Sequence, residues 1–327
     1  MTKQDLRIVF LGTPDFAVES LRRLVEGRYN VVGVVTMPDK IAGRGHRLIQ
    51  SPVKQYAVDH GLHLMQPERL KAPEFVDELR SLEADLFIVI AFRMLPEVVW
   101  TMPRLGTFNL HASLLPRYRG AAPINRAVMA GDTITGVTTF MLRHEIDTGD
   151  ILRQESIEIG PDECVGSVHD RLMMLGADLT IDTVDHIIAG DLRPIPQDEL
   201  ITAGEAPVPA PKIFAEDMVV DWQRPAAEVH NHVRGLSPYP AARASMADGD
   251  STPEDVKIYR TALTGLPAKG PAGTVHIADG RIYVDTADER IEILELQLAG
   301  KRRMAAADFL RGARLSSPRF VQAGHSF

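Results

Sequence analysis

The feature that most constrains the fold is a series of short, almost wholly apolar runs in the first half of the chain. A strand that is apolar along its whole length is covered on both faces, as strands of parallel sheets are. Between the first two runs, residues 16–25 carry apolar side chains at helical spacing. Repeated strand and helix segments predict right-handed crossovers and an α/β fold with a mostly parallel sheet. The expected strands are residues 7–11, 31–36, 85–91, 107–111 and 136–141.

The residue pattern of the sequence changes near residue 190, from helical periodicity to a proline-rich stretch. A helix is expected at residues 165–188, and prolines then crowd the stretch up to Pro211. Farther on, four segments alternate apolar and polar residues, which is typical of antiparallel strands with one buried face. We therefore predict a first domain at 1–190, a linker at 191–212 and a small OB-like β-barrel domain at 213–327. The expected barrel strands are residues 256–260, 273–277, 281–285 and 289–294.

Composition excludes several classes of site. Cys164 is the single cysteine, so neither an intrachain disulfide nor a thiolate zinc site can form. We interpret His230, His232 and His276 as structural residues and expect no metal, because they have no Cys or Glu partner at ligand spacing. There is no apolar run of about 18 residues and no signal-peptide pattern at the N-terminus. We expect a cytoplasmic monomer with no membrane partner.

Charge limits the role that nucleic acid can have. The formal net charge of -8 argues against strong non-specific binding of nucleic acid over the whole surface. Two local stretches are nevertheless basic. One is the segment from Lys40 to Lys54, and the other is residues 301–319, where Asp308 is the only acid. Both are candidates for phosphate contacts, although such runs are often only solvated surface.

Residues 107–111 carry the first candidates for chemistry. Side chains alternate faces along a strand, so Asn109 and His111 share one face while Phe108 and Leu110 share the other. The two polar groups lie near the carboxyl end of the strand, where open α/β sheets bind ligands. A loop with Pro, Gly and two Arg follows at residues 113–125, and Asp147 lies in the loop after the expected fifth strand.

Asn109, His111, residues 113–124 and the Asp147–Gly149 segment closely resemble the folate-dependent formyltransferases. The resemblance implies a Rossmann-like formyltransferase domain followed by a barrel. It implies catalytic roles for Asn109, His111 and Asp147, and 10-formyltetrahydrofolate as the formyl donor. In that reaction an amine attacks the formyl carbon. Asn109 and protonated His111 can donate hydrogen bonds to the oxyanion, and Asp147 can pair with the imidazolium or accept a proton.

The resemblance also implies where the folate binds. Residues 88–95 are similar to the pterin-binding strand and turn of the family, although Phe92, Arg93 and Met94 replace a longer turn that often contains Ala-Tyr-Gly. The other side of the pterin is expected to be the start of the loop that follows His111. The implied folate-binding residues are Ile90, Phe92, Ser113, Leu114, Leu115 and Pro116.

The acceptor amine is the remaining question, because several relatives share the Asn–His–Asp core. Residues 39–48 are similar to the basic loop of those family members that formylate methionyl initiator tRNA. The resemblance thus implies that Lys40, Arg44 and Arg47 bind tRNA and that the product, N-formylmethionyl-tRNA, serves translation initiation. One alternative is a nucleotide-amino-sugar N-formyltransferase, because residues 114–120 also resemble those enzymes. Another is a non-enzymatic RNA-binding protein, which would have no need of all three catalytic residues.

Overall fold

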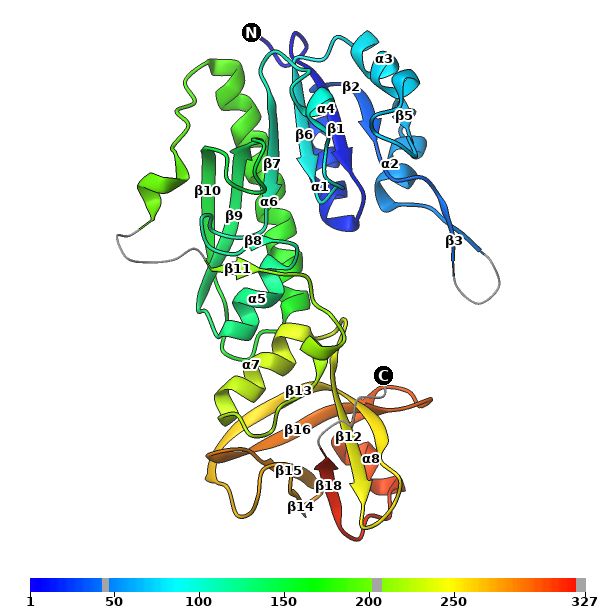
Figure 1. The fold of residues 1–327 in the computed structure, drawn as a ribbon, viewed down its shortest axis with the longest axis vertical. Helices are drawn as coiled ribbons and strands as arrows, with labels where there is room; N and C mark the ends of the chain where they lie inside the picture. The colour runs from blue at the N-terminus through cyan, green and yellow to red at the C-terminus, as the bar shows by residue number, and fades with distance from the viewer. Residues whose placement is uncertain (43–46, 202–207, 322–327) are drawn as a thin grey trace. The chain divides into compact units, whose positions relative to one another are not determined.

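The computed structural model describes residues 1–42, 47–201 and 208–321, and the chain divides into two compact units (Figure 1). The first unit holds Met1–Gly120, Gly136–Ile157 and His169–Pro209. The second holds Ala121–Thr135, Glu158–Val168 and Ala210–Phe327. The domain boundaries expected near residues 190 and 213 stay a prediction, and each unit is described separately.

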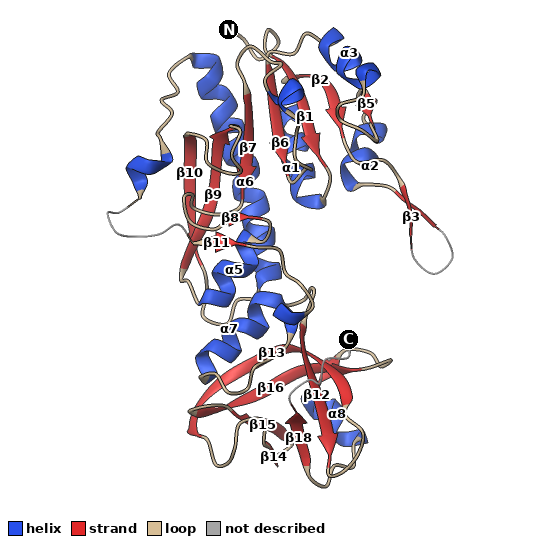
Figure 2. Ribbon diagram, viewed as in Figure 1, coloured by secondary structure: helices blue, strands red, loops and turns tan. Residues whose placement is uncertain are grey.

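The first unit is built on a seven-stranded sheet with the order β10-β9-β7-β6-β1-β2-β5 (Figure 2). β1 pairs in parallel with β2 and β6, β2 with β5, and β6 with β7, whereas β7 and β9 are antiparallel. The predicted mostly parallel α/β sheet is therefore confirmed. The strands are β1 (Arg7–Gly12), β2 (Asn30–Val35), β5 (Leu64–Met65), β6 (Leu86–Ile90), β7 (Thr107–His111), β9 (Ile134–Met141) and β10 (Ile151–Glu158).

Helices cover both faces of this sheet, which explains why its central strands are apolar throughout. On one face, Val9 and Phe87 pack in a cluster with Phe75 of α3 and Val99 of α4. On the other face lie α1 and α6, whose hydroxyls Ser20 and Thr180 are 3.5 Å apart. The helices are α1 (Asp15–Glu26), α2 (Pro52–Asp59), α3 (Pro73–Ser81), α4 (Glu97–Trp100) and α6 (Val165–Ala189).

Shorter elements complete the first unit. The small sheets join β3 (Lys40–Ala42) with β4 (Arg47–Ile49), and β8 (Arg119–Gly120) with β11 (Pro209–Ala210). A 3-10 helix, η1 (Gln197–Leu200), lies within the proline-rich stretch. Over the ranges that the structure describes, no helix has both the length and the apolarity needed to span a membrane.

The second unit contains an antiparallel sheet with the order β14-β15-β16-β13-β12-β18, and β17 adds to β16. The bridge between Thr274 and Arg319 and the bond from Phe320 N–H to Gly273 O (2.9 Å) join its two edges, so the predicted barrel is confirmed. Its strands are β12 (Ala242–Asp248), β13 (Glu254–Pro267), β14 (Val275–Ala278), β15 (Arg281–Asp285), β16 (Glu289–Leu298), β17 (Met304–Ala305) and β18 (Pro318–Val321). The helices of this unit are α5 (Pro123–Ala130), η2 (Glu216–Met218), α7 (Ala226–Leu236) and α8 (Ala306–Gly312).

His230 of α7 is buried and hydrogen-bonded on both ring nitrogens. Its Nε2 lies 3.2 Å from Pro161 O and its Nδ1 lies 3.0 Å from the Thr261 hydroxyl. A carbonyl oxygen only accepts, so Nε2 carries the proton and Nδ1 accepts from Thr261. Burial lowers the pKa of His230, and the Pro161 carbonyl and Asp162 offset that effect only in part. The neutral ring thus belongs to the folded state, in agreement with a structural role.

We expect the free energy of unfolding to decrease as the pH falls below about 6.5, where an unfolded histidine takes up a proton. The folded pKa of His230 is lowered, so its contribution is complete above the unfolded pKa and is lost as the pH falls toward the folded value. Urea unfolding at pH 7.5 and 5.5 measures the loss, which should be smaller in His230→Gln. An equal loss in variant and wild type would remove His230 from the pH dependence.

Candidate active site

β7 brings Asn109 and His111 to the same face of the sheet. Asn109 is the register partner of Val89 in the parallel pairing with β6. Leu110 points to the other face and packs against Gly176 of α6, where an added Cβ would lie only 2.7 Å from Leu110 Cδ2. Asn109 therefore faces away from α6. His111 is 7% exposed. The Oδ1 of Asn109 is buried and has no hydrogen-bond partner among the described residues. A buried amide oxygen without a partner is uncommon, and it is suited to accept a hydrogen bond from a ligand.

The ring of His111 is held by the main chain on one side and faces Asp147 on the other. Nε2 lies 2.9 Å from Tyr118 O, so Nε2 carries a proton. Nδ1 lies 3.8 Å from Asp147 Oδ2, which is beyond a hydrogen bond but within reach of an ion pair when the ring is charged. The edge of the imidazole meets Phe140, with 6.4 Å between ring centroids. A second proton on Nδ1 would place a cation opposite the carboxylate.

Asp147 sits in a tight turn between β9 and β10. Its backbone has φ 54°, in the left-handed region that non-glycine residues rarely occupy. Its Oδ2 accepts a hydrogen bond from Gly120 N–H at 3.0 Å, and the residue is 9% exposed. Two residues later, a Cβ on Gly149 would lie 1.6 Å from Met141 O, so only glycine fits there. Such strain at a buried carboxylate is typical of functional sites.

Residues 113–116 form a loop whose backbone is fixed by Thr138 of β9. The Thr138 hydroxyl donates to Ser113 O (2.6 Å) and accepts from Leu115 N–H (3.2 Å) and Gln154 Nε2 (2.8 Å). Gln154 Nε2 also donates to Leu115 O at 3.0 Å. Thr138 and Gln154 could not be identified from the sequence, because neither lies in a recognisable motif and both act only through contacts made in the fold.

The side chains of this loop differ in what they can offer a ligand. Ser113 is fully buried and its hydroxyl donates to Arg117 O at 2.7 Å, while Leu115 packs in a cluster with Phe140 and Ile151. Leu114 and Pro116 are only half-buried. Ser113 and Leu115 thus shape the loop, whereas Leu114 and Pro116 are more accessible to a ligand. Folate binding by these four residues stays a prediction.

Replacing Thr138 by Val leaves Ser113 O and Leu115 N–H without their buried partner. We expect the Michaelis constant for the formyl donor to rise and the protein to lose about 1–3 kcal/mol of stability. The matched control is Thr139→Val, because the Thr139 hydroxyl lies 2.8 Å from Thr183 of α6 and does not contact the loop. This control should lose stability without a change in the donor Michaelis constant. Donor kinetics that respond equally in the two variants would contradict a role of Thr138 in the loop.

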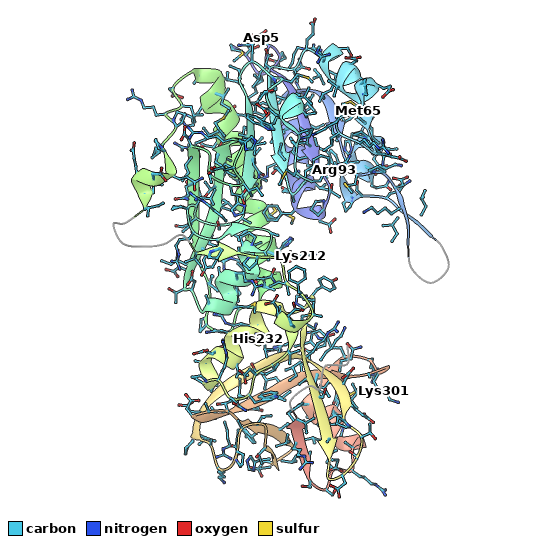
Figure 3. All side chains as sticks on the ribbon, in the orientation of Figure 1. Asp5, Met65, Arg93, Lys212, His232 and Lys301 are labelled. Carbon is cyan, nitrogen blue, oxygen red and sulfur yellow. The ribbon has the colours of Figure 1, made fainter. Side chains whose placement is uncertain are left out.

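The turn after β6 is the other predicted folate contact. Ile90 is fully buried at the end of the strand, Ala91 has φ 47°, and Phe92 is half-buried. The guanidinium of Arg93 donates to Glu68 O at 2.9 Å and to Pro67 O, so the turn is tied to the segment after β5 (Figure 3). The turn at Phe92, Arg93 and Met94, whose sequence differs from the usual one, is therefore anchored by the Arg93 side chain.

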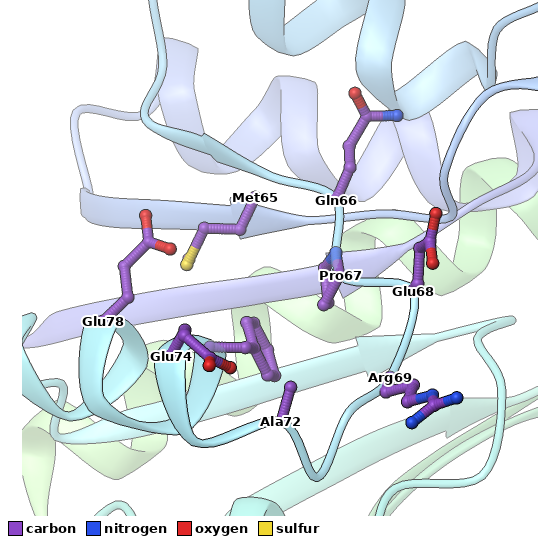
Figure 4. Close-up of a pocket in the computed structure, with 9 residues that line it drawn as sticks. Met65, Gln66, Pro67, Glu68, Arg69, Ala72, Glu74 and Glu78 are labelled. Carbon is purple, nitrogen blue, oxygen red and sulfur yellow. The ribbon is translucent and has the colours of Figure 1, made fainter.

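A cavity of about 400 Å³ lies beside this anchor (Figure 4). It is lined by Pro67 and Glu68, by Met65 of β5, and by residues of α3 that include Glu74 and Glu78. Its lining contains none of Asn109, His111 and Asp147. The cavity is therefore not the space in which the catalytic side chains converge. Within the described parts of the chain, no group of three or more His, Cys, Asp or Glu side chains is arranged to hold a metal ion.

Two of the three predicted tRNA-binding residues, Lys40 and Arg47, lie on a separate hairpin formed by β3 and β4 (Figure 1). Lys40 is exposed and pairs with Ile49, and Arg47 pairs with Ala42. Arg44 lies outside the described residues. At the root of the hairpin, Asp39 accepts from Lys54 Nζ (2.5 Å) and Gln66 Nε2 (2.9 Å). The structure thus groups the three catalytic candidates in one place and puts Lys40 and Arg47 on another element.

Comparison with known proteins points to one family. The model of a family described as formyl transferase matches residues 6–184, and that of a formyl transferase C-terminal domain matches residues 212–314. A methionyl-tRNA formyltransferase of Bacteroides fragilis is 55% identical over 317 residues, which are 97% of this chain and 98% of that protein. One from Parabacteroides distasonis is 56% identical over 315 residues, covering 95% and 97%.

A solved structure shares the fold at low sequence identity. It is an N-formyltransferase from Helicobacter canadensis in complex with folinic acid and dTDP-3-aminofucose. Its TM-score is 0.65 at 16% identity, over 88% of this chain and 98% of that one. At this identity the likeness supports the architecture of sheet and barrel and does not discriminate between acceptors.

Proposed function

Since the chain belongs to the formyl transferase family, we propose that it transfers the formyl group of 10-formyltetrahydrofolate to the α-amino group of methionyl initiator tRNA. The product is N-formylmethionyl-tRNA for translation initiation. The observation that carries this proposal is the identity of 55% with a methionyl-tRNA formyltransferase along 97% of the chain. We place the protein in the cytoplasm and propose that it acts as a monomer.

The reaction exchanges one carbon–nitrogen bond for another. The methionyl nitrogen bonds to the formyl carbon, the bond from that carbon to the folate nitrogen breaks, and one proton moves from the amine to the folate nitrogen. There is no change of oxidation state. The protein must therefore stabilise an oxyanion and carry a proton, and the buried polar groups on β7 are suited to both tasks.

Each of the three side chains has a role that its geometry supports. The amide of Asn109 can donate to the developing oxyanion through Nδ2, while its buried Oδ1, which has no partner among the described residues, is available to accept from a ligand N–H. His111 in its charged form is a second donor and then the acid that protonates the leaving nitrogen, with Asp147 as its counter-ion at 3.8 Å. Asp147 also accepts the proton of the amine, directly or through a water. The half-buried Leu114, Pro116 and Phe92 are the folate contacts that remain accessible.

We propose that the β3–β4 hairpin contacts the acceptor tRNA through the phosphates. Lys40 is an exposed cation there, and Arg44 and Arg47 add charge to the same short segment of sequence. The contacts of Asp39 with Lys54 and Gln66 fix the root from which the hairpin extends. A nucleotide amino sugar has no long phosphate backbone for such an element to follow, so the hairpin favours tRNA as the acceptor.

The proposal is tested by incubating the purified protein with 10-formyltetrahydrofolate and aminoacylated initiator tRNA. Hydrolysis of the aminoacyl ester then releases the amino acid for chromatography. We expect N-formylmethionine in an amount equal to the folate consumed, and none when the donor is omitted. Folate consumption without a formylated amino acid would contradict the proposal.

A further inference from the structure

Gln197 is a buried glutamine whose amide is fully engaged around the Asp147 turn. It is 2% exposed and begins η1. Its Nε2 donates to Asp147 O (2.9 Å) and Gly149 O (2.8 Å), and its Oε1 accepts from Arg119 Nε (3.1 Å) and Nη2 (2.7 Å). Both N–H groups and both lone pairs are therefore used.

The bonds of Gln197 act on a backbone that would not adopt its shape by itself. Asp147 has φ 54°, and Gly149 is so close to Met141 O that no side chain fits. A left-handed residue in a turn persists only where its surroundings hold it. Gln197 binds the carbonyl of the strained residue and that of Gly149, so it fixes the direction in which the Asp147 side chain leaves the turn.

The segment from Tyr118 to Gly120 connects Gln197 to His111 through hydrogen bonds. Tyr118 O accepts from His111 Nε2, Arg119 orients Gln197, and Gly120 N–H donates to the Asp147 carboxylate at 3.0 Å. Three consecutive residues thus bind the His111 imidazole, the Gln197 amide and the Asp147 carboxylate. In this arrangement Nδ1 of His111 and Oδ2 of Asp147 are 3.8 Å apart.

We infer that Gln197 is a positioning residue for formyl transfer, which acts by holding Asp147 against His111. The inference rests on the proposed function, because it assigns Asp147 a part in the reaction. It also connects residues 195–197, within the predicted linker, to the reaction. That stretch is anchored just before Gln197, where Ile151 and Ile195 exchange two backbone hydrogen bonds of 2.8 Å.

The expected signature is a loss in kcat. Displacing a catalytic group by about 1 Å can cost about 10²-fold in rate, and the loss of a partner that orients a metal ligand costs about 10–100-fold in activity, which sets the scale for Gln197. We expect Gln197→Ala to lower kcat by about 10–100-fold with little change in the Michaelis constant of the formyl donor. Gln197→Glu keeps the size and the Arg119 contact but loses both N–H donors, so it should show a similar loss even if the Ala variant folds poorly.

The deciding experiment is a double-mutant cycle, measured as single-turnover rates of formyl transfer in the full-length protein. Gln197→Ala should lower the rate in the wild-type background and have almost no further effect in Asp147→Asn. The contrast is Gln154→Ala, which removes another amide whose bonds go to the 113–116 loop. Its effect should be the same in both backgrounds and should appear in the donor Michaelis constant.

The same variants can be followed without turnover by hydrogen exchange of peptides covering residues 141–150. Exchange should become faster in Gln197→Ala and stay as in wild type in Gln154→Ala. An equal rate loss by Gln197→Ala in both backgrounds, or unchanged exchange in the turn, would overturn the inference. Failure of the proposed function would be seen differently, as a wild-type protein that forms no N-formylmethionine.

Discussion

Asp147→Asn is expected to lower the rate of formyl transfer by about 10²–10⁴-fold while the protein stays folded. A neutral amide can neither accept the proton of the amine nor serve as a counter-ion for His111, whose Nδ1 lies 3.8 Å from the carboxylate. The replacement has the same shape, and its oxygen can still accept from Gly120 N–H. The measurement is a rapid-quench single turnover together with the urea midpoint of unfolding.

A surface carboxylate provides the control for Asp147. Asp182 of α6 accepts from Arg153 Nε at 2.6 Å and is partly exposed, so Asp182→Asn changes the same charge outside the cluster. Its turnover should stay within about 2-fold of wild type, since exposed ion pairs contribute little. If Asp147→Asn transferred formyl groups at the wild-type rate, Asp147 would have no part in the mechanism.

Asn109→Ala is expected to lower kcat by about 10²–10³-fold, the cost of removing one donor to an oxyanion. Stability should behave differently from most buried polar substitutions. Asn109 Oδ1 has no hydrogen-bond partner among the described residues, so truncating the side chain breaks no hydrogen bond of that atom with them. The truncation also removes an unpaired polar atom from the interior, where its burial costs free energy. We therefore expect an unfolding free energy equal to or above that of wild type.

The combination of low turnover and undiminished stability is what separates a functional asparagine from a structural one. A suitable control is Asn30→Ala, because Asn30 Nδ2 donates to Gln4 O at 2.9 Å away from β7. That variant should keep wild-type turnover. An Asn109→Ala protein that is strongly destabilised but still transfers formyl groups normally would assign Asn109 to the architecture.

The sequence predicts best where one physical requirement determines the residues. β6 is apolar at every position because helices cover both faces of the sheet, and alternation alone places Asn109 and His111 on one face of β7. By contrast, the sequence does not predict β10, because its pattern of Ile, Leu, Arg, Gln and Glu is that of a partly exposed edge strand. Asp147 could be identified only through the family resemblance.

The residues that support the site could not be predicted from their local sequence. Gln197 is separated from Asp147 by 50 residues, and Gln154 from Leu115 by 39, so nothing near either glutamine indicates its partner. The prolines around Gln197 predict a linker, and the local sequence gives no sign that Ile195 contacts Ile151 or that Gln197 contacts Asp147 and Arg119. The contact of Tyr118 with His111 uses a backbone carbonyl that any residue provides, so the identity of residue 118 does not reveal it.

The acceptor that the protein uses can be determined by a competition between the two candidate substrates. The wild-type protein would receive limiting formyl-labelled 10-formyltetrahydrofolate with equal concentrations of methionyl initiator tRNA and a nucleotide-linked amino sugar. We expect the label to be recovered almost entirely on the methionyl-tRNA. Recovery of the label on the sugar would contradict this expectation, leaving the fold and the roles of Asn109, His111 and Asp147 in place but refuting the assignment of the β3–β4 hairpin to tRNA.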